Sequence, residues 1–324
     1  MNESHLKHWI PYQLNENEGN YSCRWLYTNG VPFTGPFFNE SINKCLSHPY
    51  NSNAFKPSTD LSVLPECSSA LNSIAPTAFI FHVSRCGSTL ISQSLCLNNH
   101  HIVLPEVPFI DELLRLNKNR NWSSPLNREE LIKAVIKIYG QTTEGLRKYL
   151  FIKTDSWHIH FMPLLRKLYP HAPFILLYRK PDEVMRSHQK LRGMQAVPGV
   201  IPNELLGIEN EKISPADFDG HTIKVLENYF KAFILASQQD PMSLLLNYNE
   251  GIINMMQRFC RFTGVELNKA DWALIETRSG FNAKYPDQVF HEEQPDEAIP
   301  VYQQQAFNFY HELEELRKAQ IANT

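Results

Sequence analysis

One stretch of the chain, Ala78 to Leu97, constrains the fold more than any other. It begins with a run of bulky and β-branched apolar residues, passes through a short polar loop, and continues with apolar residues at helical spacing. The pattern predicts a strand, a tight turn and a helix. Such a turn points successive backbone N–H groups and the positive end of a helix at one place, which suits a phosphate or sulfate. We therefore interpret it as an anion-binding loop with side-chain donors at Arg85, Ser88 and Thr89.

Two familiar phosphate loops do not fit this stretch. The nucleotide-triphosphate loop needs a Gly-Lys pair with another glycine before it, but Phe81 or His82 stands at that place and the lysine is absent. A phosphatase loop places an arginine six residues after its cysteine, whereas Ser92 stands six residues after Cys86. The sequence thus argues against Cys86 as a nucleophile, and a plain strand-to-helix connection remains the alternative.

Strand and helix patterns alternate beyond the loop, which favours βαβ units and a mainly parallel sheet. Ligands of such sheets bind beyond the carboxyl ends of the strands. The expected strands are 78–83, 102–104, 150–153, 174–179 and 243–247, and the expected helices are 88–97, 128–139, 161–169, 182–192, 222–238 and 250–263, the last capped by Gly264.

A charged residue ends or follows each of the five expected strands. They are Arg85, Glu106, Lys153, Arg179 and Glu250. Parallel strands bring their carboxyl ends to one edge of a sheet, so we expect these side chains to gather there. The pattern indicates a site for a multiply anionic ligand.

Composition sets the number of domains. With 324 residues, 43% hydrophobic and 20% charged, the chain is long enough for one large domain with a small addition. We expect residues 1–75 to be an aromatic-rich extension with a small β-hairpin and helix. The Thr28-Asn29-Gly30 step, between two aromatic runs, is the expected hairpin turn. Residues 76–324 are the expected α/β domain.

Charge and cysteine usage exclude several classes of protein. The net charge of -3 gives no overall basic surface for nucleic acid. No apolar signal region opens the chain and no stretch is apolar enough to span a membrane, so we expect a cytoplasmic protein. The six cysteines form no CxxC pair, which argues against zinc ribbons and disulfides. The run 300–320 is typical of an amphipathic helix that packs on the domain or pairs with another copy, which leaves a homodimer open.

The loop after the first expected strand resembles that of a known family, the sulfotransferases. These enzymes carry a sulfuryl group from PAPS (3′-phosphoadenosine 5′-phosphosulfate) to an acceptor hydroxyl or amine. The segment from Ser84 to Leu90 is similar to their 5′-phosphosulfate loop, with serine in place of proline and Cys86 in place of the first serine. Arg179, followed eight residues later by Ser187, is similar to their 3′-phosphate motif.

The spacing of the motifs is similar to that of the tyrosylprotein branch of the family. Arg85 and Glu106 are 21 residues apart, and Lys153 and Arg179 are 26 residues apart. That branch carries its catalytic base and lysine at the positions of Glu106 and Lys153. The resemblance covers about residues 78–250.

The resemblance implies a fold, a co-substrate and a set of site residues. The fold is a three-layer, P-loop-type parallel sheet flanked by helices, and the product of PAPS is adenosine 3′,5′-bisphosphate, with no metal required. Arg85, Glu106 and Lys153 would be catalytic. The expected donor-binding residues are Arg85, Cys86, Gly87, Ser88, Thr89, Leu90, Arg179 and Ser187, with Ser279 and Lys284 as weaker members because the family's Arg-Lys-Gly motif lacks its lysine here.

Several alternatives stay open. His158 or His160 follows Lys153 and can assist or replace Glu106 as the base. A P-loop kinase using ATP and Mg²⁺ and a non-catalytic anion-binding module are the competing functions. The sequence does not identify the acceptor, a small molecule or another hydroxyl-bearing compound, because the loops that would select it, among them 107–127 and 192–221, do not align with the family. The second loop is either a lid or acceptor wall or a plain connection.

Overall fold

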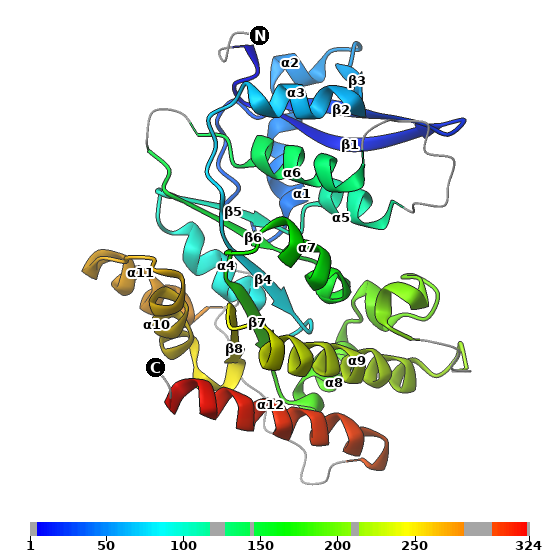
Figure 1. Ribbon diagram of the computed structural model, residues 1–324, viewed down its shortest axis with the longest axis vertical. Coiled ribbons are helices and arrows are strands. Elements are labelled where there is room, and N and C mark those ends of the chain that lie inside the picture. Colours follow the sequence, from blue (N-terminus) through cyan, green and yellow to red (C-terminus); the bar gives the residue numbers. More distant parts are fainter. Residues whose placement is uncertain (1–4, 117–126, 143–145, 209–213, 282–299, 323–324) are drawn as a thin grey trace. The chain divides into compact units, whose positions relative to one another are not determined.

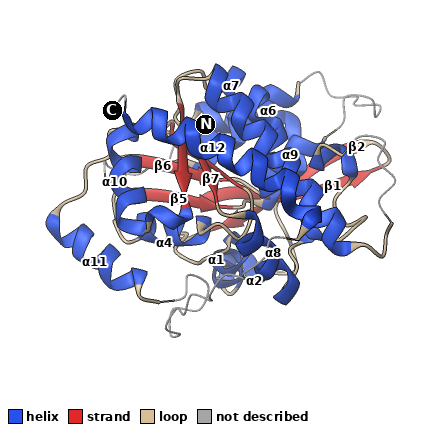
Figure 2. Ribbon diagram, turned by 90° about the horizontal axis from the view of Figure 1, so that it is seen from below, coloured by secondary structure: helices blue, strands red, loops and turns tan. Residues whose placement is uncertain are grey.

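The computed structural model describes residues 5–116, 127–142, 146–208, 214–281 and 300–322 of the chain (Figure 1). Its main sheet has five parallel strands in the order β5-β6-β4-β7-β8, flanked by helices (Figure 2). The strands are β4 (Pro76–His82), β5 (His101–Pro105), β6 (Tyr149–Lys153), β7 (Phe174–Tyr178) and β8 (Ser243–Asn247). The α/β fold with a parallel sheet is therefore confirmed.

The chain divides into two compact units. Unit 1 consists of residues 1–77 and 95–153, and unit 2 of residues 78–94 and 154–324. The sequence predicts a domain boundary between residues 75 and 76. That boundary stays a prediction. Among the described residues, no helix is both long and apolar enough to cross a membrane.

Unit 1 contains the predicted N-terminal hairpin, but the hairpin turn lies elsewhere than expected. Strands β1 (Trp9–Asn17) and β2 (Asn20–Tyr27) pair in antiparallel fashion through a turn at Glu18 and Gly19, which have φ angles of 50° and 82°. Asn29 and Gly30 also have positive φ, yet they only lead the chain out of β2. Pro32 follows and has no N–H for a strand ladder, so no partner strand forms there. A third strand, β3 (Ser58–Asp60), pairs with β2 instead.

Among its described residues, unit 1 also holds two paired strands and five α-helices. Strands β5 and β6 align in parallel from His101↔Tyr149 to Pro105↔Lys153. Helix α6 begins with a capping box, in which Asn127 and Glu130 each accept a backbone N–H of the other. The helices are α1 (Phe38–Leu46), α2 (Pro49–Ser52), α3 (Leu64–Ser69), α5 (Pro108–Arg115) and α6 (Arg128–Tyr139).

Unit 2 holds most of β4 and all of β7 and β8, whose residues are almost all buried. Such apolar runs are typical of parallel strands covered on both faces. The helices are α4 (Ser88–Cys96, its last two residues in unit 1), α7 (Met162–Leu168), α8 (Pro181–Lys190), α9 (Phe218–Gln239), α10 (Ile252–Thr263), α11 (Lys269–Ser279) and α12 (Gln304–Ala322). Short 3-10 turns span Leu61–Val63 in unit 1, and Ser156–Phe161, Met194–Ala196, Asn203–Leu206, Tyr248–Glu250 and Val301–Gln303 in unit 2.

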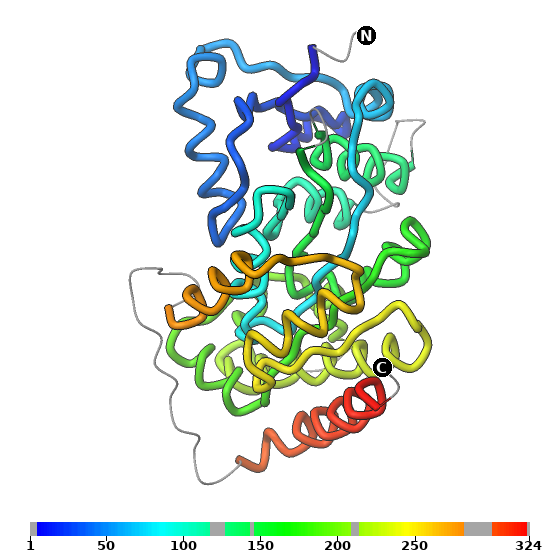
Figure 3. Tube along the Cα trace, turned by 90° about the vertical axis from the view of Figure 1, so that its left-hand side faces the viewer, coloured from blue at the N-terminus to red at the C-terminus, as the bar shows by residue number. Residues whose placement is uncertain are grey.

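The C-terminal helix α12 packs on α9 and β8 (Figure 3, red). Its residue Gln320 accepts the Leu245 N–H at 3.0 Å and donates to the Ser243 carbonyl at 3.0 Å. These two bonds occupy backbone groups of β8, the last strand in the sheet order. The helix thus covers a strand edge that would otherwise be open to pairing with another chain.

Candidate active site

The glycine loop, residues 83–87, connects β4 to α4 as the sequence predicts. Ser84, Arg85 and Gly87 have positive φ angles of 67°, 52° and 81°. Left-handed residues within a turn direct successive N–H groups to one side and so form a concave anion site. For Ser84 and Arg85 this conformation costs on the order of 1–3 kcal/mol each, so the surrounding contacts must hold the loop in place.

Two buried side chains hold the glycine loop. The His82 ring accepts the Ser84 N–H at Nδ1 (3.1 Å) and contacts the Thr154 carbonyl through Nε2 (2.9 Å). Because a carbonyl only accepts, the ring hydrogen is on Nε2. Cys86 is fully buried and its Sγ donates to the Leu177 carbonyl at 3.3 Å. Only the backbone of Cys86 is therefore available to a ligand.

Gly87 lies directly against the ring of Tyr248, the first residue after β8. A Cβ atom on Gly87 would come within 2.4 Å of Tyr248 Cδ2. No side chain fits in that space, and the positive φ angle also favours glycine. The loop's single glycine is thus required both by its backbone conformation and by this ring.

Arg179, the residue after β7, contacts the same ring. Its guanidinium lies over Tyr248 at 4.2 Å from the ring centroid, a cation–π arrangement, and forms an ion pair with Glu183 on α8. Ser187 is half-buried on α8 four residues beyond Glu183, hence on the same helix face. The structure therefore brings the glycine loop and the predicted 3′-phosphate arginine to one aromatic ring.

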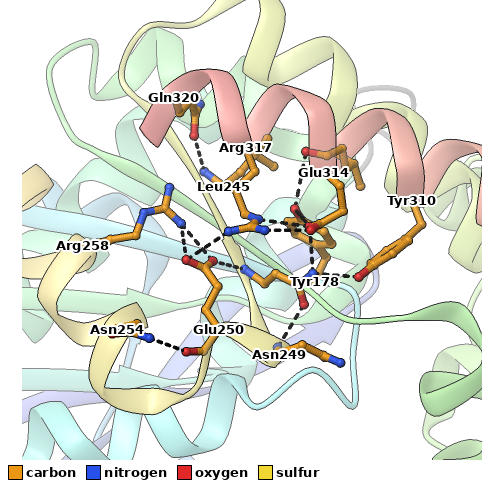
Figure 4. A network of polar contacts seen from close by, with 12 residues as sticks. Tyr178, Leu245, Asn249, Glu250, Asn254, Arg258, Tyr310, Glu314, Arg317 and Gln320 are labelled. Carbon is orange, nitrogen blue, oxygen red and sulfur yellow. Dashed lines mark hydrogen bonds and ion pairs between the residues drawn. The ribbon is translucent and has the colours of Figure 1, made fainter. Parts of the chain in front are cut away.

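A polar network holds the turn that carries Tyr248 (Figure 4). Glu250, at the end of the turn, accepts the Asn247 N–H at 2.8 Å and closes a capping box. Its carboxylate also accepts from Arg258 at 2.7 and 2.9 Å, and Arg317 of α12 lies at 3.2 Å. Two arginines from separate helices thus fix the turn after β8.

The second carboxylate of this network is Glu314 on α12. It accepts from Arg317 Nη2 at 2.7 Å, Asn247 Nδ2 at 2.7 Å and the Tyr178 hydroxyl at 2.5 Å. Burial alone would raise the pKa of Glu314, but these hydrogen bonds outweigh burial and hold the pKa below its usual value. Burial, followed by the bond to Glu314, raises the pKa of Tyr178. The network therefore joins α12 to the ends of β7 and β8.

Unit 1 brings together the other two predicted catalytic residues, Lys153 and Glu106. Their strands are paired so that Pro105 lies opposite Lys153, and the Glu106 N–H donates to the Lys153 carbonyl at 2.8 Å. Lys153 Nζ forms an ion pair with Glu106 Oε1, with the lysine side chain 1% exposed and the glutamate 22%. Glu106 has a positive φ of 53°, a strained conformation of the kind found at functional sites. The glutamate is thus the solvent-accessible member of a largely buried ion pair.

The remaining predicted donor-site residues lie on α4, near α8 and on α11. Arg85 Nη2 donates to the Leu191 carbonyl, just beyond α8. Ser88 and Thr89 are buried in the first turn of α4, and the Leu90 N–H donates to the Gly87 carbonyl at 2.9 Å. The Ser279 hydroxyl donates to the Glu276 carbonyl of its own helix at 2.6 Å and has no other hydrogen bond within the described ranges. Lys284 lies outside the described residues.

The two histidines that follow Lys153, His158 and His160, contact other residues of the protein through a hydrogen bond and through ring packing. His158 Nδ1 accepts the Asp155 N–H at 3.2 Å in a capping box, and its ring is buried. The His160 ring packs against Tyr229. Burial lowers the pKa of His160, against the opposing effect of a hydrogen bond with the Leu206 backbone. The sequence prediction that either one serves as the base stays a prediction.

Sequence reasoning missed the roles of Tyr248, Glu183 and the Glu250–Arg317 network. Tyr248 directly follows the strand that ends at Asn247. The rule that ligands bind beyond the carboxyl ends of parallel strands therefore points to this residue. Its contact with Gly87 carries no local sequence signal, because the two residues are 161 positions apart.

A search of solved structures finds bacterial sulfotransferases similar to this chain. Sulfotransferase STF9 from Mycobacterium avium is 14% identical with a TM-score of 0.45, covering 79% of this chain and 78% of that chain. A sulfotransferase from Alicyclobacillus acidocaldarius is 14% identical with a TM-score of 0.41, covering 77% of this chain and 96% of that chain. No protein-family model and no curated protein matches the chain.

Proposed function

We propose that this protein is a sulfotransferase that moves a sulfuryl group from PAPS to a hydroxyl or amine of a small-molecule acceptor. One observation carries the proposal: the Tyr248 ring contacts both Gly87 of the anion-binding loop and the guanidinium of Arg179. PAPS has one anionic group on the 5′ side of its ribose and another on the 3′ side. A loop and a separate arginine held by one ring suit that arrangement better than the linear phosphates of ATP.

The donor-binding roles follow from the chemistry of each group. The backbone N–H groups from Gly87 to Leu90 and the Arg85 side chain would bind the 5′-phosphosulfate. Arg179, now paired with Glu183, would turn its planar fork to the 3′-phosphate. Ser187 on the same helix face would add a hydroxyl donor. Both arginines already have acceptors, the Leu191 carbonyl and Glu183, that a phosphate would replace.

The transfer step requires positive charge and a base. Charge accumulates on the leaving phosphate oxygen and over the sulfuryl oxygens, by analogy with phosphoryl transfer, so Arg85 and Lys153 would stabilise the transition state. Glu106, the more exposed member of its ion pair, would accept the proton of the acceptor hydroxyl. Lys153 would then both position that carboxylate and stabilise the sulfuryl group.

A two-arm incubation separates this function from its rivals. The protein is incubated with PAPS without metal, or with ATP and Mg²⁺, each with a panel of phenols, alcohols and amines. We expect adenosine 3′,5′-bisphosphate to accumulate only when PAPS and a suitable acceptor are both present. Consumption of ATP would indicate a kinase, and turnover of neither donor would indicate a binding module; either result would contradict the proposal.

A further inference from the structure

A pocket of about 140 Å³ lies in unit 1, away from the strand ends that carry Glu106 and Lys153. It is lined by His101 and Ile102 at the start of β5, together with Arg147, which precedes β6. The strand from His101 to Pro105 spans roughly 13 Å at about 3.3 Å per residue. The pocket is therefore at the opposite end of the same two strands.

Arg147 places a fixed positive charge on the wall of this pocket. Its Nη1 donates to the carbonyls of Asn99 at 2.6 Å and His101 at 2.8 Å, which holds the guanidinium in position. Among the described residues that line the pocket, none is an aspartate or a glutamate. Burial raises the pKa of the neighbouring Cys96 thiol to about 12, against the opposing effect of Arg147, so the thiol stays neutral. The guanidinium charge thus has no anionic partner within the described lining.

A buried hydroxyl adds a second polar group to the pocket. Thr142 Oγ1 is inaccessible to solvent and has no hydrogen-bond partner among the described residues. A buried hydroxyl without a partner costs free energy, and a ligand that bonds with it removes that cost. The side-chain amide of the neighbouring Gln141 already has hydrogen-bond partners at both ends. It accepts the His8 N–H at 2.7 Å and donates to the Trp9 carbonyl at 3.0 Å. Thr142 is therefore a residue of the wall that can hydrogen-bond a guest, in addition to Arg147.

Part of the remaining wall is apolar, and the pocket is small. Phe33, Tyr139 and Ile10 contribute aromatic and aliphatic surface. A cavity of about 150 Å³ holds a molecule the size of benzene, which sets the size of the guest. A ring or branched chain that bears one carboxylate suits the apolar part of the wall, the guanidinium and the hydroxyl together.

We propose that this pocket binds a small organic monocarboxylate of about the size of benzoate, at a site distinct from the Glu106–Lys153 ion pair. The carboxylate pairs with Arg147 and accepts the Thr142 hydroxyl, and the apolar body lies against Phe33 and Tyr139. The site is independent of the proposed sulfuryl transfer, because none of its residues belongs to the donor site or to that ion pair.

Calorimetric titration of the full chain with benzoate and with its uncharged isostere benzamide tests the proposal. We expect benzoate to bind at one site per chain with a Kd of roughly 0.1–1 mM, typical of a ligand of so few atoms. Benzamide should bind at least about tenfold more weakly, because it brings no charge to Arg147. Binding should persist in the presence of saturating adenosine 3′,5′-bisphosphate. Equal binding of the two compounds, displacement by the bisphosphate, or no benzoate binding up to about 10 mM would overturn the proposal.

Two variants assign the binding to this pocket. Arg147→Gln should abolish the preference for benzoate over benzamide, and Thr142→Val, which keeps the shape of the side chain, should weaken benzoate binding by about three- to tenfold. Arg179→Ala serves as the matched control and should bind benzoate as the wild type does. Thermal melting of each variant without ligand checks folding. A Thr142→Val protein that melts normally and binds benzoate unchanged would contradict the assignment.

Discussion

We expect one substitution in the network that joins α12 to the Tyr248 turn, Arg317→Met, to lower the stability of the fold strongly. Methionine keeps most of the length of the side chain and removes the guanidinium. Arg317 lies at 2.7 Å from Glu314 and at 3.2 Å from Glu250, and its side chain is 14% exposed. Removing one member of a buried ion pair costs about 3–5 kcal/mol. Glu314 keeps Tyr178 and Asn247 as donors, so we expect the lower end, about 3 kcal/mol of unfolding free energy.

The neighbouring residue Lys318 supplies a matched control. It pairs with Glu315 at 2.7 Å on the same helix, but the two side chains are 61% and 74% exposed. Such pairs contribute about 0–1 kcal/mol, so Lys318→Met should leave stability nearly unchanged. In urea unfolding, with an m-value of about 3 kcal/mol/M, Arg317→Met should lower the midpoint by about 1 M. Equal midpoints for the two variants would refute the reasoning.

The pH dependence of this difference follows from the lowered pKa of Glu314. A carboxyl whose pKa is lower in the folded than in the unfolded state stabilises the fold above its unfolded value of about 4.5. That contribution is lost as the pH falls through the folded-state value. The stability difference between wild type and Arg317→Met should therefore shrink between pH 7 and about pH 3. A constant difference over this range would mean that Glu314 is not the partner that matters.

Two further variants test the proposed site itself. Gly87→Ala should abolish binding of adenosine 3′,5′-bisphosphate in calorimetry, because the new Cβ would lie 2.4 Å from the Tyr248 ring. Gly264→Ala is the control, since Gly264 has a φ of 70° but no neighbour within 4 Å of an added Cβ. That variant has the backbone strain without the clash and should bind the bisphosphate normally. Glu106→Gln should lower sulfuryl transfer to the best acceptor of the panel by about 10²–10⁴-fold while bisphosphate binding is retained. Near-normal turnover would remove Glu106 from the mechanism.

Local pattern explains why much of the fold was predictable. The strand, loop and helix from β4 to α4 follow from apolar periodicity broken by one glycine, and Gly264 caps α10 with a φ of 70° as expected. The sequence predicts the wrong hairpin turn because Asn29 and Gly30 have the positive φ angles of such a turn but no strand follows them to pair with β2. Helix α5 falls in a segment expected to be loop, although Pro108 at its first turn and its buried apolar positions carried a helical signal.

Some contacts of the predicted site residues follow from the sequence, and others depend on the register between strands that are far apart in the sequence. Strand-end reasoning placed Glu106 and Lys153 together, because parallel strands end at one edge of a sheet. The meeting of Arg179 and Tyr248 depends on the register of β7 and β8, in which Tyr178 pairs with Asn247. Register between strands that are about 70 residues apart is set by tertiary packing and leaves no local signature. The same holds for the contacts of α12.

Calorimetric titration with adenosine 3′,5′-bisphosphate and with adenosine 5′-monophosphate tests the central claim most directly. If the loop and Arg179 bind the two ends of one nucleotide, the bisphosphate should bind at one site per chain and at least about tenfold more tightly than the monophosphate, since a charged hydrogen-bonded contact contributes about 1.5–3 kcal/mol. Arg179→Ala should remove that preference. Absence of bisphosphate binding, or equal affinity of the wild type for both nucleotides, would contradict the assignment of the donor site.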